Sequence, residues 1–198
     1  MKQPEETPLI LAVDEAPERR RLLRDSLRTA GFARVHLLDA TNNLLEQVLS
    51  LRPDLILMEV DSPSRDVLEQ LSLVRDRHPT AVLMVSQDPQ AQSIQAAVAS
   101  GVCAYSVDGT SAAKVRPAVE VAMATFESFK KLRVELAQAK TELSHHKRID
   151  RAKHILIEEK GMTEDQAHKA LRKLSMDRKR KLIDVADDVI AFTRFFHT

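Results

Sequence analysis

The chain has 198 residues, 43% of them hydrophobic, so one full-sized domain and a small second module can form. A single cysteine excludes an internal disulfide, no apolar run approaches the roughly 20 residues of a membrane span, and the first residues lack a signal peptide's apolar stretch, so we expect a cytoplasmic protein without a membrane partner. The net charge of +1 divides into −4 over residues 1–125 (13 Lys and Arg, 17 Asp and Glu) and +5 over residues 126–198 (17 against 12), which favours an anionic partner for the C-terminal part.

Short apolar runs alternate with amphipathic helical patterns through the first half of the chain. Strands are expected at 9–13, 34–38, 54–60, 81–86 and 103–107, and helices at 18–30, 44–51, 66–77 and 90–100. This alternation predicts an α/β domain with a doubly wound, five-stranded parallel sheet of the flavodoxin type. Ligands of such sheets bind beyond the carboxyl ends of the strands. The polar residues expected at that edge are Asp14, Glu15, Glu59, Ser86 and Asp108.

After Ala112 the strand pattern stops and a long helix is expected. Apart from Pro117, which a first helical turn tolerates, nothing interrupts it before Gly161, so it spans about 45 residues. Apolar residues spaced by three and four form a coiled-coil seam, which a single helix cannot bury by itself. We expect a homodimer through this seam; the alternative is that the stripe packs back on the α/β domain. The seam residues are Phe129, Leu132, Leu136, Ala139 and Leu143.

Two further helices are expected beyond Gly161. Thr163 and Gln166 have the spacing of a capping box, which opens the first of them. The second is expected to start at about Arg178. Together with the end of the long helix they predict a small three-helix bundle whose lysines and arginines face outward. The apolar residues available for its core are Ile155, Leu156, Ala167, Leu171, Leu182, Val185 and Val189.

Residues 8–125 resemble the receiver domain of response regulators. The resemblance is carried by the acidic pair Asp14-Glu15, the segment 53–63 around Glu59, the hydroxyl of Ser86 and the switch aromatic Tyr105. It implies a pocket in which the acidic pair and an acceptor Asp hold Mg²⁺, while the acceptor takes a phosphoryl group. A transferring phosphoryl group also needs a fixed positive charge, which a Lys supplies in that family.

Two positions depart from the receiver pattern. Glu59 stands at the acceptor position and Asp108 at the Lys position, so the local charge changes by two units against an incoming anion. We therefore expect a degenerate receiver that does not transfer phosphoryl groups and docks a partner protein instead. Asp14, Glu15 and Glu59 remain the positions for a divalent ion, since hard cations favour clustered carboxylates. The alternative is that these acids merely repel one another.

Residues 148–198 resemble the ANTAR output domain of transcription antiterminators. The match follows the family's order and spacing through Arg151-Ala152-Lys153, Gly161, residues 163–167, Leu171-Arg172 and residues 180–186. Residues 101–109, 115–117 and 123–128 are most similar to the nitrate-assimilation subgroup, the NasT-like proteins. The resemblance implies binding to tandem stem-loops in a leader mRNA, which keeps a terminator from forming, and control by a nitrate- or nitrite-sensing protein.

RNA contacts are expected mainly from basic residues of the ANTAR-like segment. Small Ala152 would allow a loop base to approach, and arginine planes with apolar contacts would replace aromatic stacking, since the chain has no Trp. Leu171 and Met176 fit a core role better than a base contact, although Met176 stays a candidate. The expected RNA-binding residues are Arg148, Arg151, Ala152, Lys153, Arg172, Lys173, Met176, Arg178, Lys179, Arg180 and Lys181.

The sequence thus predicts a flexible tail at 1–7, a degenerate receiver at 8–125, a coiled-coil linker at 126–147 and an ANTAR domain at 148–198. We expect a non-enzymatic, RNA-binding antitermination regulator without a cofactor. Three alternatives stay open: a DNA-binding response regulator with a helix-turn-helix, a working phosphoacceptor, and a protein adaptor whose basic residues are dispensable.

Overall fold

The computed structural model describes residues 7–39, 43–107, 109 and 111–196, and of residues 194–196 only the backbone. The chain separates into two compact units, Met1–Lys130 and Lys131–Thr198, called here the N-terminal and the C-terminal unit. Helix α5 (Ala112–Lys160) contributes its first residues to one unit and the rest to the other. Within the described part of the chain, no helix combines the length and the apolar character that a bilayer crossing requires.

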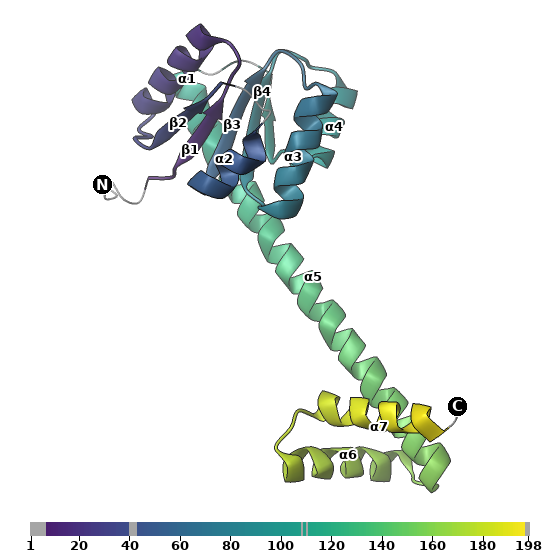
Figure 1. Cartoon of the computed structure of the whole chain (residues 1–198). Coiled ribbons are helices and arrows are strands. Elements are labelled where there is room, and N and C mark those ends of the chain that lie inside the picture. The colour runs from purple at the N-terminus through teal and green to yellow at the C-terminus, as the bar shows by residue number, and fades with distance from the viewer. Residues whose placement is uncertain (1–6, 40–42, 108, 110, 197–198) are drawn as a thin grey trace. The chain divides into compact units, whose positions relative to one another are not determined.

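The N-terminal unit is a parallel sheet with helices on both faces (Figure 1). Its strands are β1 (Ile10–Val13), β2 (Val35–Leu38), β3 (Leu55–Val60), β4 (Ala81–Ser86) and β5 (Ala104–Ser106), in the order β2-β1-β3-β4-β5. All neighbouring pairs are parallel. The helices before α5 are α1 (Pro17–Thr29), α2 (Leu44–Leu51), α3 (Arg65–Arg77) and α4 (Ala91–Ala99). The predicted fold class is confirmed.

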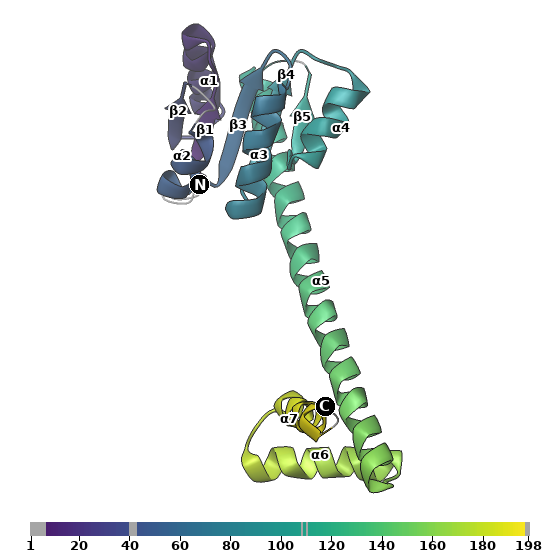
Figure 2. The same ribbon diagram turned by 45° about the vertical axis from the view of Figure 1, so that its right-hand side comes forward.

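The central strands alternate their side chains between two apolar layers, and both layers are buried. Leu55 and Leu57 of β3 pack with Leu23 of α1 and Val119 of α5 on one face of the sheet. On the other face, Ile56 and Met58 belong to the layer that α2, α3 and α4 cover (Figure 2). Burial on both faces explains why β3 and β4 read as continuous apolar runs. The polar residues that follow the strands are thereby held at one edge of the sheet.

The C-terminal unit is a bundle of the end of α5 with α6 (Glu164–Arg178) and α7 (Leu182–Phe196). Its core holds Ala152, Leu171, Val185 and Ala186, with half-buried Leu156 and Leu182 packed against them. The predicted three-helix bundle is confirmed. The capping box is also present, because the Thr163 hydroxyl accepts from the Gln166 N–H while the Gln166 side chain accepts from the Thr163 N–H.

The long helix is one element of 49 residues, as the absence of breaking residues predicts. The expected start of the last helix at Arg178 is wrong. Arg178 is the final residue of α6, and Lys179 takes a left-handed conformation with φ of 51°, which no α-helix can pass through. The N–H of Arg180 then bonds to the carbonyl of Ser175 at 3.0 Å, which closes the turn before α7.

Candidate functional site

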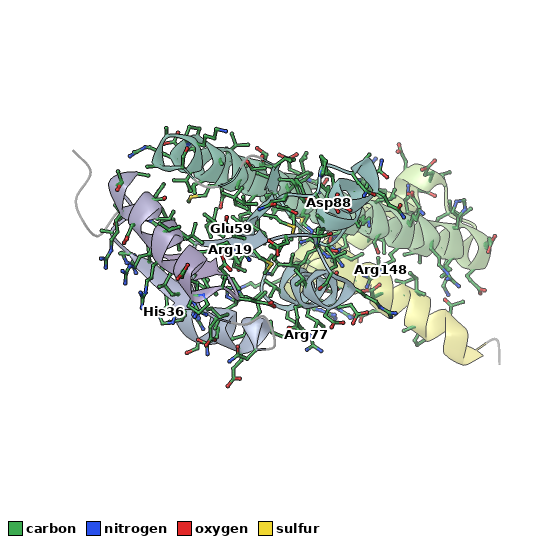
Figure 3. All side chains as sticks on the ribbon, turned by 90° about the horizontal axis from the view of Figure 1, so that it is seen from above. Arg19, His36, Glu59, Arg77, Asp88 and Arg148 are labelled. Carbon is green, nitrogen blue, oxygen red and sulfur yellow. The ribbon has the colours of Figure 1, made fainter. Side chains whose placement is uncertain are left out.

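An open cavity of about 460 Å³ lies at the carboxyl ends of the strands, where the sequence predicts the receiver pocket. Arg19 and Glu59 both line it, and Figure 3 shows them next to one another. The remaining lining residues are Val60, Asp61, Val85, Ser86, Gln87, Val107 and Gly109. Asp108 lies outside the described residues.

A guanidinium occupies the acidic side of this cavity. Arg19 Nε donates to both carboxylate oxygens of Asp14, at 3.2 and 3.0 Å, and Arg19 Nη1 donates to Asp61 Oδ1 at 2.5 Å. Asp14 is 1% exposed and also accepts from the Ala16 N–H at 2.8 Å. The hydrogen bond that Arg19 donates to Asp14, followed by the one that it donates to Asp61, raises the pKa of Arg19 above its usual value, so the guanidinium stays charged.

The polar groups at the end of β4 are satisfied within the protein. Ser86 Oγ donates to the carbonyl of Asp61 at 2.9 Å and accepts from the Asp88 N–H at 3.1 Å. The Tyr105 hydroxyl donates to the carbonyl of Asp88 at 2.8 Å. Hydrogen bonds from the Ser93 hydroxyl, the Gln90 N–H and the Ser62 hydroxyl lower the pKa of Asp88. The switch hydroxyl and the switch aromatic are thus both engaged with neighbouring loops.

The expected ligands of a divalent ion are not brought together. Asp14 is covered by Arg19, whereas Glu15 is exposed to solvent. Among the residues that the structure describes, no group of three His, Cys, Asp or Glu is disposed to hold a metal ion. The carboxylates at this edge therefore do not fit Mg²⁺ in the arrangement that the receiver resemblance implies.

The nine cations of the predicted RNA-binding set fall into two groups, and the first is held in ion pairs. Lys153 Nζ lies 2.8 Å from Asp150 and 2.9 Å from Glu164, which raises the pKa of Lys153 and lowers the pKa of both acids. On α7, Asp187 pairs with Arg148, and Asp188 pairs with Arg180 and, at 3.9 Å, with Arg178. These four cations brace the bundle, and their charge is partly neutralised.

The second group consists of exposed cations without such partners. Within the described part of the chain they make no ion pair or side-chain hydrogen bond. They come from the end of α5, from adjacent positions on α6, and from the turn between α6 and α7. We call them the free cations: Arg151, Arg172, Lys173, Lys179 and Lys181. They are the part of the predicted RNA-binding set that is available to an anionic ligand.

Two apolar positions of this unit, Ala152 and Met176, differ from expectation, and a third, Phe192, carried none. Ala152 is fully buried, so its expected contact with a loop base is wrong, and its small size serves the packing of α5 on α7 instead. Leu171 is buried, as predicted, but Met176 is 71% exposed and is not a core residue. Phe192 on α7 is an aromatic side chain that is 67% exposed, and the sequence analysis gave it no role. It stands in an apolar run, which gave no sign of its exposure.

The seam residues of α5 are exposed along their whole row. Phe129, Leu132, Leu136 and Leu143 are between 56% and 59% exposed, and Ala139 is also exposed. Large apolar side chains repeated at this spacing are typical of a surface that another helix covers. Dimerisation through them stays a prediction.

In comparisons with known proteins, different families match the two units of the chain. The response regulator receiver domain matches residues 10–107, and the ANTAR domain matches residues 137–190. The transcriptional regulatory protein PdtaR of Mycobacterium tuberculosis is 29% identical over 182 residues, which cover 92% of this chain and 88% of that protein. The nitrate regulatory protein of Klebsiella oxytoca is 40% identical over 52 residues, 26% of this chain and 13% of that protein.

Solved structures support the fold of the N-terminal unit. A response regulator from Thermotoga maritima superposes with a TM-score of 0.53 at 19% identity, over 60% of this chain and 98% of that one. The signal receiver domain of NarL from Mycobacterium tuberculosis gives 0.52 at 22% identity, over 60% and 98%. With a receiver fold followed by an ANTAR segment, the chain belongs to the response regulators that carry an ANTAR domain.

Proposed function

We propose that this protein is a non-enzymatic transcription antitermination regulator that binds tandem stem-loops of a leader mRNA through its C-terminal unit. The observation that carries the proposal is the set of free cations on the ANTAR bundle. Phosphate contacts by Lys and Arg supply most of the affinity for a nucleic acid, and they require cations that are not already neutralised. Five such residues on one small bundle meet this requirement.

RNA is favoured over duplex DNA by the arrangement of the helices. The turn from α6 to α7 is closed by Lys179 and by the Ser175 hydroxyl, which donates to the Arg180 carbonyl at 2.6 Å. The start of α7, which follows this turn, carries Asp184, Asp187 and Asp188 and no Lys or Arg over residues 182–193, so a recognition helix presented there would offer the DNA phosphates no cation of its own. Loop bases of a hairpin need only the free cations and an exposed flat side chain such as that of Phe192.

Replacing Arg172 and Lys173 with alanine is expected to weaken binding of a two-hairpin RNA by about 10-fold to 100-fold at moderate salt, because two phosphate contacts are lost. The slope of log K against log salt should become shallower by roughly two units. Mobility shifts of the full-length protein at several salt concentrations measure both quantities.

The matched control is Arg21→Ala with Arg28→Ala. Both arginines are exposed on α1 without an ion pair in the described structure, so the net charge changes equally while the C-terminal unit stays intact. The control should bind like the wild type. If both double variants bind alike, the free cations do not contact RNA, and an adaptor role is favoured. Tighter binding to duplex DNA of equal length would favour the DNA-binding alternative.

We further propose that a sensor protein, not phosphorylation, controls the N-terminal unit. The engaged Ser86 hydroxyl and the Arg19 guanidinium across Asp14 support this proposal, as does Glu59 at the acceptor position. The similarity to a nitrate regulatory protein favours a nitrate or nitrite signal. One partner that masks the seam would suffice for a two-state control, because it needs only different affinities for the two states.

Treatment with acetyl phosphate and Mg²⁺ is expected to add no phosphoryl group to the protein. The same result is expected after Glu59→Asp, because restoring the acceptor alone leaves Arg19 on Asp14 and leaves Ser86 bonded to the Asp61 carbonyl. Intact-protein mass spectrometry measures the added mass. A phosphoryl adduct on the wild type would support the phosphoacceptor alternative. An adduct on Glu59→Asp alone would mean that Glu59 by itself prevents phosphorylation of the wild type.

A further inference from the structure

The side chain on the acidic side of the receiver pocket comes from a residue to which neither the resemblance nor the comparisons give a role. Arg19 lies in the first turn of α1, and its guanidinium reaches across the pocket to Asp61, which follows β3. It therefore joins the loop after β1 to the loop after β3. Ser86 extends the connection to the end of β4 through its hydrogen bond to the Asp61 carbonyl.

The position of this guanidinium is the position that a bound cation would need. Asp14 is the buried carboxylate of the acidic pair, with a side chain that is fully shielded from solvent. A buried carboxylate is strongly unfavourable unless a cation or several hydrogen bonds compensate for it. Within the described residues, Arg19 supplies two of the three hydrogen bonds that the Asp14 carboxylate accepts, and the Ala16 N–H supplies the third.

A guanidinium and Mg²⁺ exclude one another at such a carboxylate. Mg²⁺ requires oxygen ligands at about 2.1 Å in near-octahedral geometry. Arg19 covers both oxygens of Asp14 with its shared Nε–H and one oxygen of Asp61 with Nη1, since a guanidinium presents several donors in one plane. An ion could bind only after Arg19 had left, and the two positive charges would then repel each other across the cavity.

We propose that Arg19 is a tethered cation that replaces the divalent ion of the receiver pocket, so that the three loops around it are fixed without any metal. The pocket is then closed to Mg²⁺ in the native protein, and removing Arg19 opens it. The proposal concerns the N-terminal unit alone and is independent of RNA binding.

The test compares the full-length wild type with Arg19→Gln, Arg19→Lys and the matched control Arg21→Gln. Arg21 lies on the same helix, is exposed, and makes no side-chain interaction within the described residues. Binding of Mn²⁺, which stands in for Mg²⁺, is followed by loss of the free-ion electron paramagnetic resonance signal. Thermal unfolding is recorded in EDTA and in excess Mg²⁺.

The wild type and Arg21→Gln are expected to bind no Mn²⁺ at millimolar concentration and to melt alike in both buffers. Arg19→Gln should melt several degrees lower in EDTA, bind Mn²⁺ at least about 10-fold more tightly than the wild type, and regain stability in Mg²⁺, because a ligand that binds only the folded state stabilises it. Arg19→Lys should fall between them without binding Mn²⁺, since its ammonium keeps the positive charge in the pocket but lacks the planar array of donors that joins Asp14 to Asp61.

Mn²⁺ binding by the wild type that equals binding by Arg19→Gln would overturn the proposal, as would an Arg19→Gln protein as stable in EDTA as Arg21→Gln. If Arg19→Gln does not fold in either buffer, the proposal is tested by comparing the wild type with Arg19→Lys. A metal-free wild type together with a destabilised Arg19→Lys supports the tethered cation, and a metal-binding wild type refutes it.

Discussion

Replacing Leu132 and Leu136 with lysine is expected to separate a dimer into monomers and to weaken binding of a tandem-hairpin RNA by about 10²-fold to 10⁴-fold. Both leucines lie in the exposed row of α5, at 59% and 56% exposure. In a coiled coil they would occupy successive core positions, d of one heptad and a of the next, where charged side chains from both chains would face each other. The two hairpins of one RNA then bind the bundles of two separate monomers. The added affinity that comes from one dimer binding both hairpins at once is therefore lost.

Sedimentation of the free protein and titration with one-hairpin and two-hairpin RNAs measure the two parts of this prediction. Affinity for the single hairpin should stay within about 3-fold of the wild type, because the bundle and its free cations are untouched. Val134→Lys is the matched control: Val134 is 52% exposed on the same helix but falls between the two core positions, on the outer face. It should remain dimeric.

The prediction is wrong if the double variant sediments as the wild type does, or if Val134→Lys dissociates equally. A wild type that is already monomeric would point to the other role for the row, in which a protein partner or the N-terminal unit covers it. The experiment therefore separates the two readings of the seam that the sequence leaves open.

The bounds of helices and strands were predictable from the sequence where residues close in the chain determine them. Strand β4 and helix α2 have the predicted bounds, because a doubly buried strand reads as an unbroken apolar run and Arg52-Pro53 ends the helix. The Thr163 capping box fixed the start of α6. The Lys179 turn was missed because its left-handed conformation is usually signalled by glycine, and the polar run from Asp177 to Lys181 reads equally well as helix.

The candidate sites were less predictable, since their geometry depends on contacts between distant residues. Arg19 and Asp61 are 42 positions apart, and nothing in the run of three arginines at the start of α1 distinguishes the one that enters the pocket. Arg148 and Asp187 are 39 positions apart. Sequence reasoning could therefore list the basic residues of the ANTAR segment, but it could not separate the braced cations from the free ones. The burial of Ala152 likewise follows from how α5, α6 and α7 pack.

Leu171→Ala is expected to unfold the C-terminal unit at temperatures at which the N-terminal unit remains folded. The buried core of this unit consists mainly of small side chains, Ala152, Val185 and Ala186, and Leu171 is its one fully buried leucine. Removing such a side chain destabilises a domain by about 2–5 kcal/mol. A bundle of this size has little more than that in total, because small domains bury a small fraction of their surface.

Thermal unfolding followed by circular dichroism should show a new early transition that removes part of the helical signal, while the sheet of the N-terminal unit melts as in the wild type. Limited proteolysis below that second transition should leave an N-terminal fragment. RNA binding should be lost together with the bundle, since the free cations depend on α5, α6 and the turn after α6 for their positions. Met176→Ala is the control, because that side chain is 71% exposed and its removal leaves no cavity. A single transition at the wild-type temperature in Leu171→Ala would mean that the bundle is stabilised by something other than its own core, and a second chain packed on the exposed seam of α5 would then be the candidate.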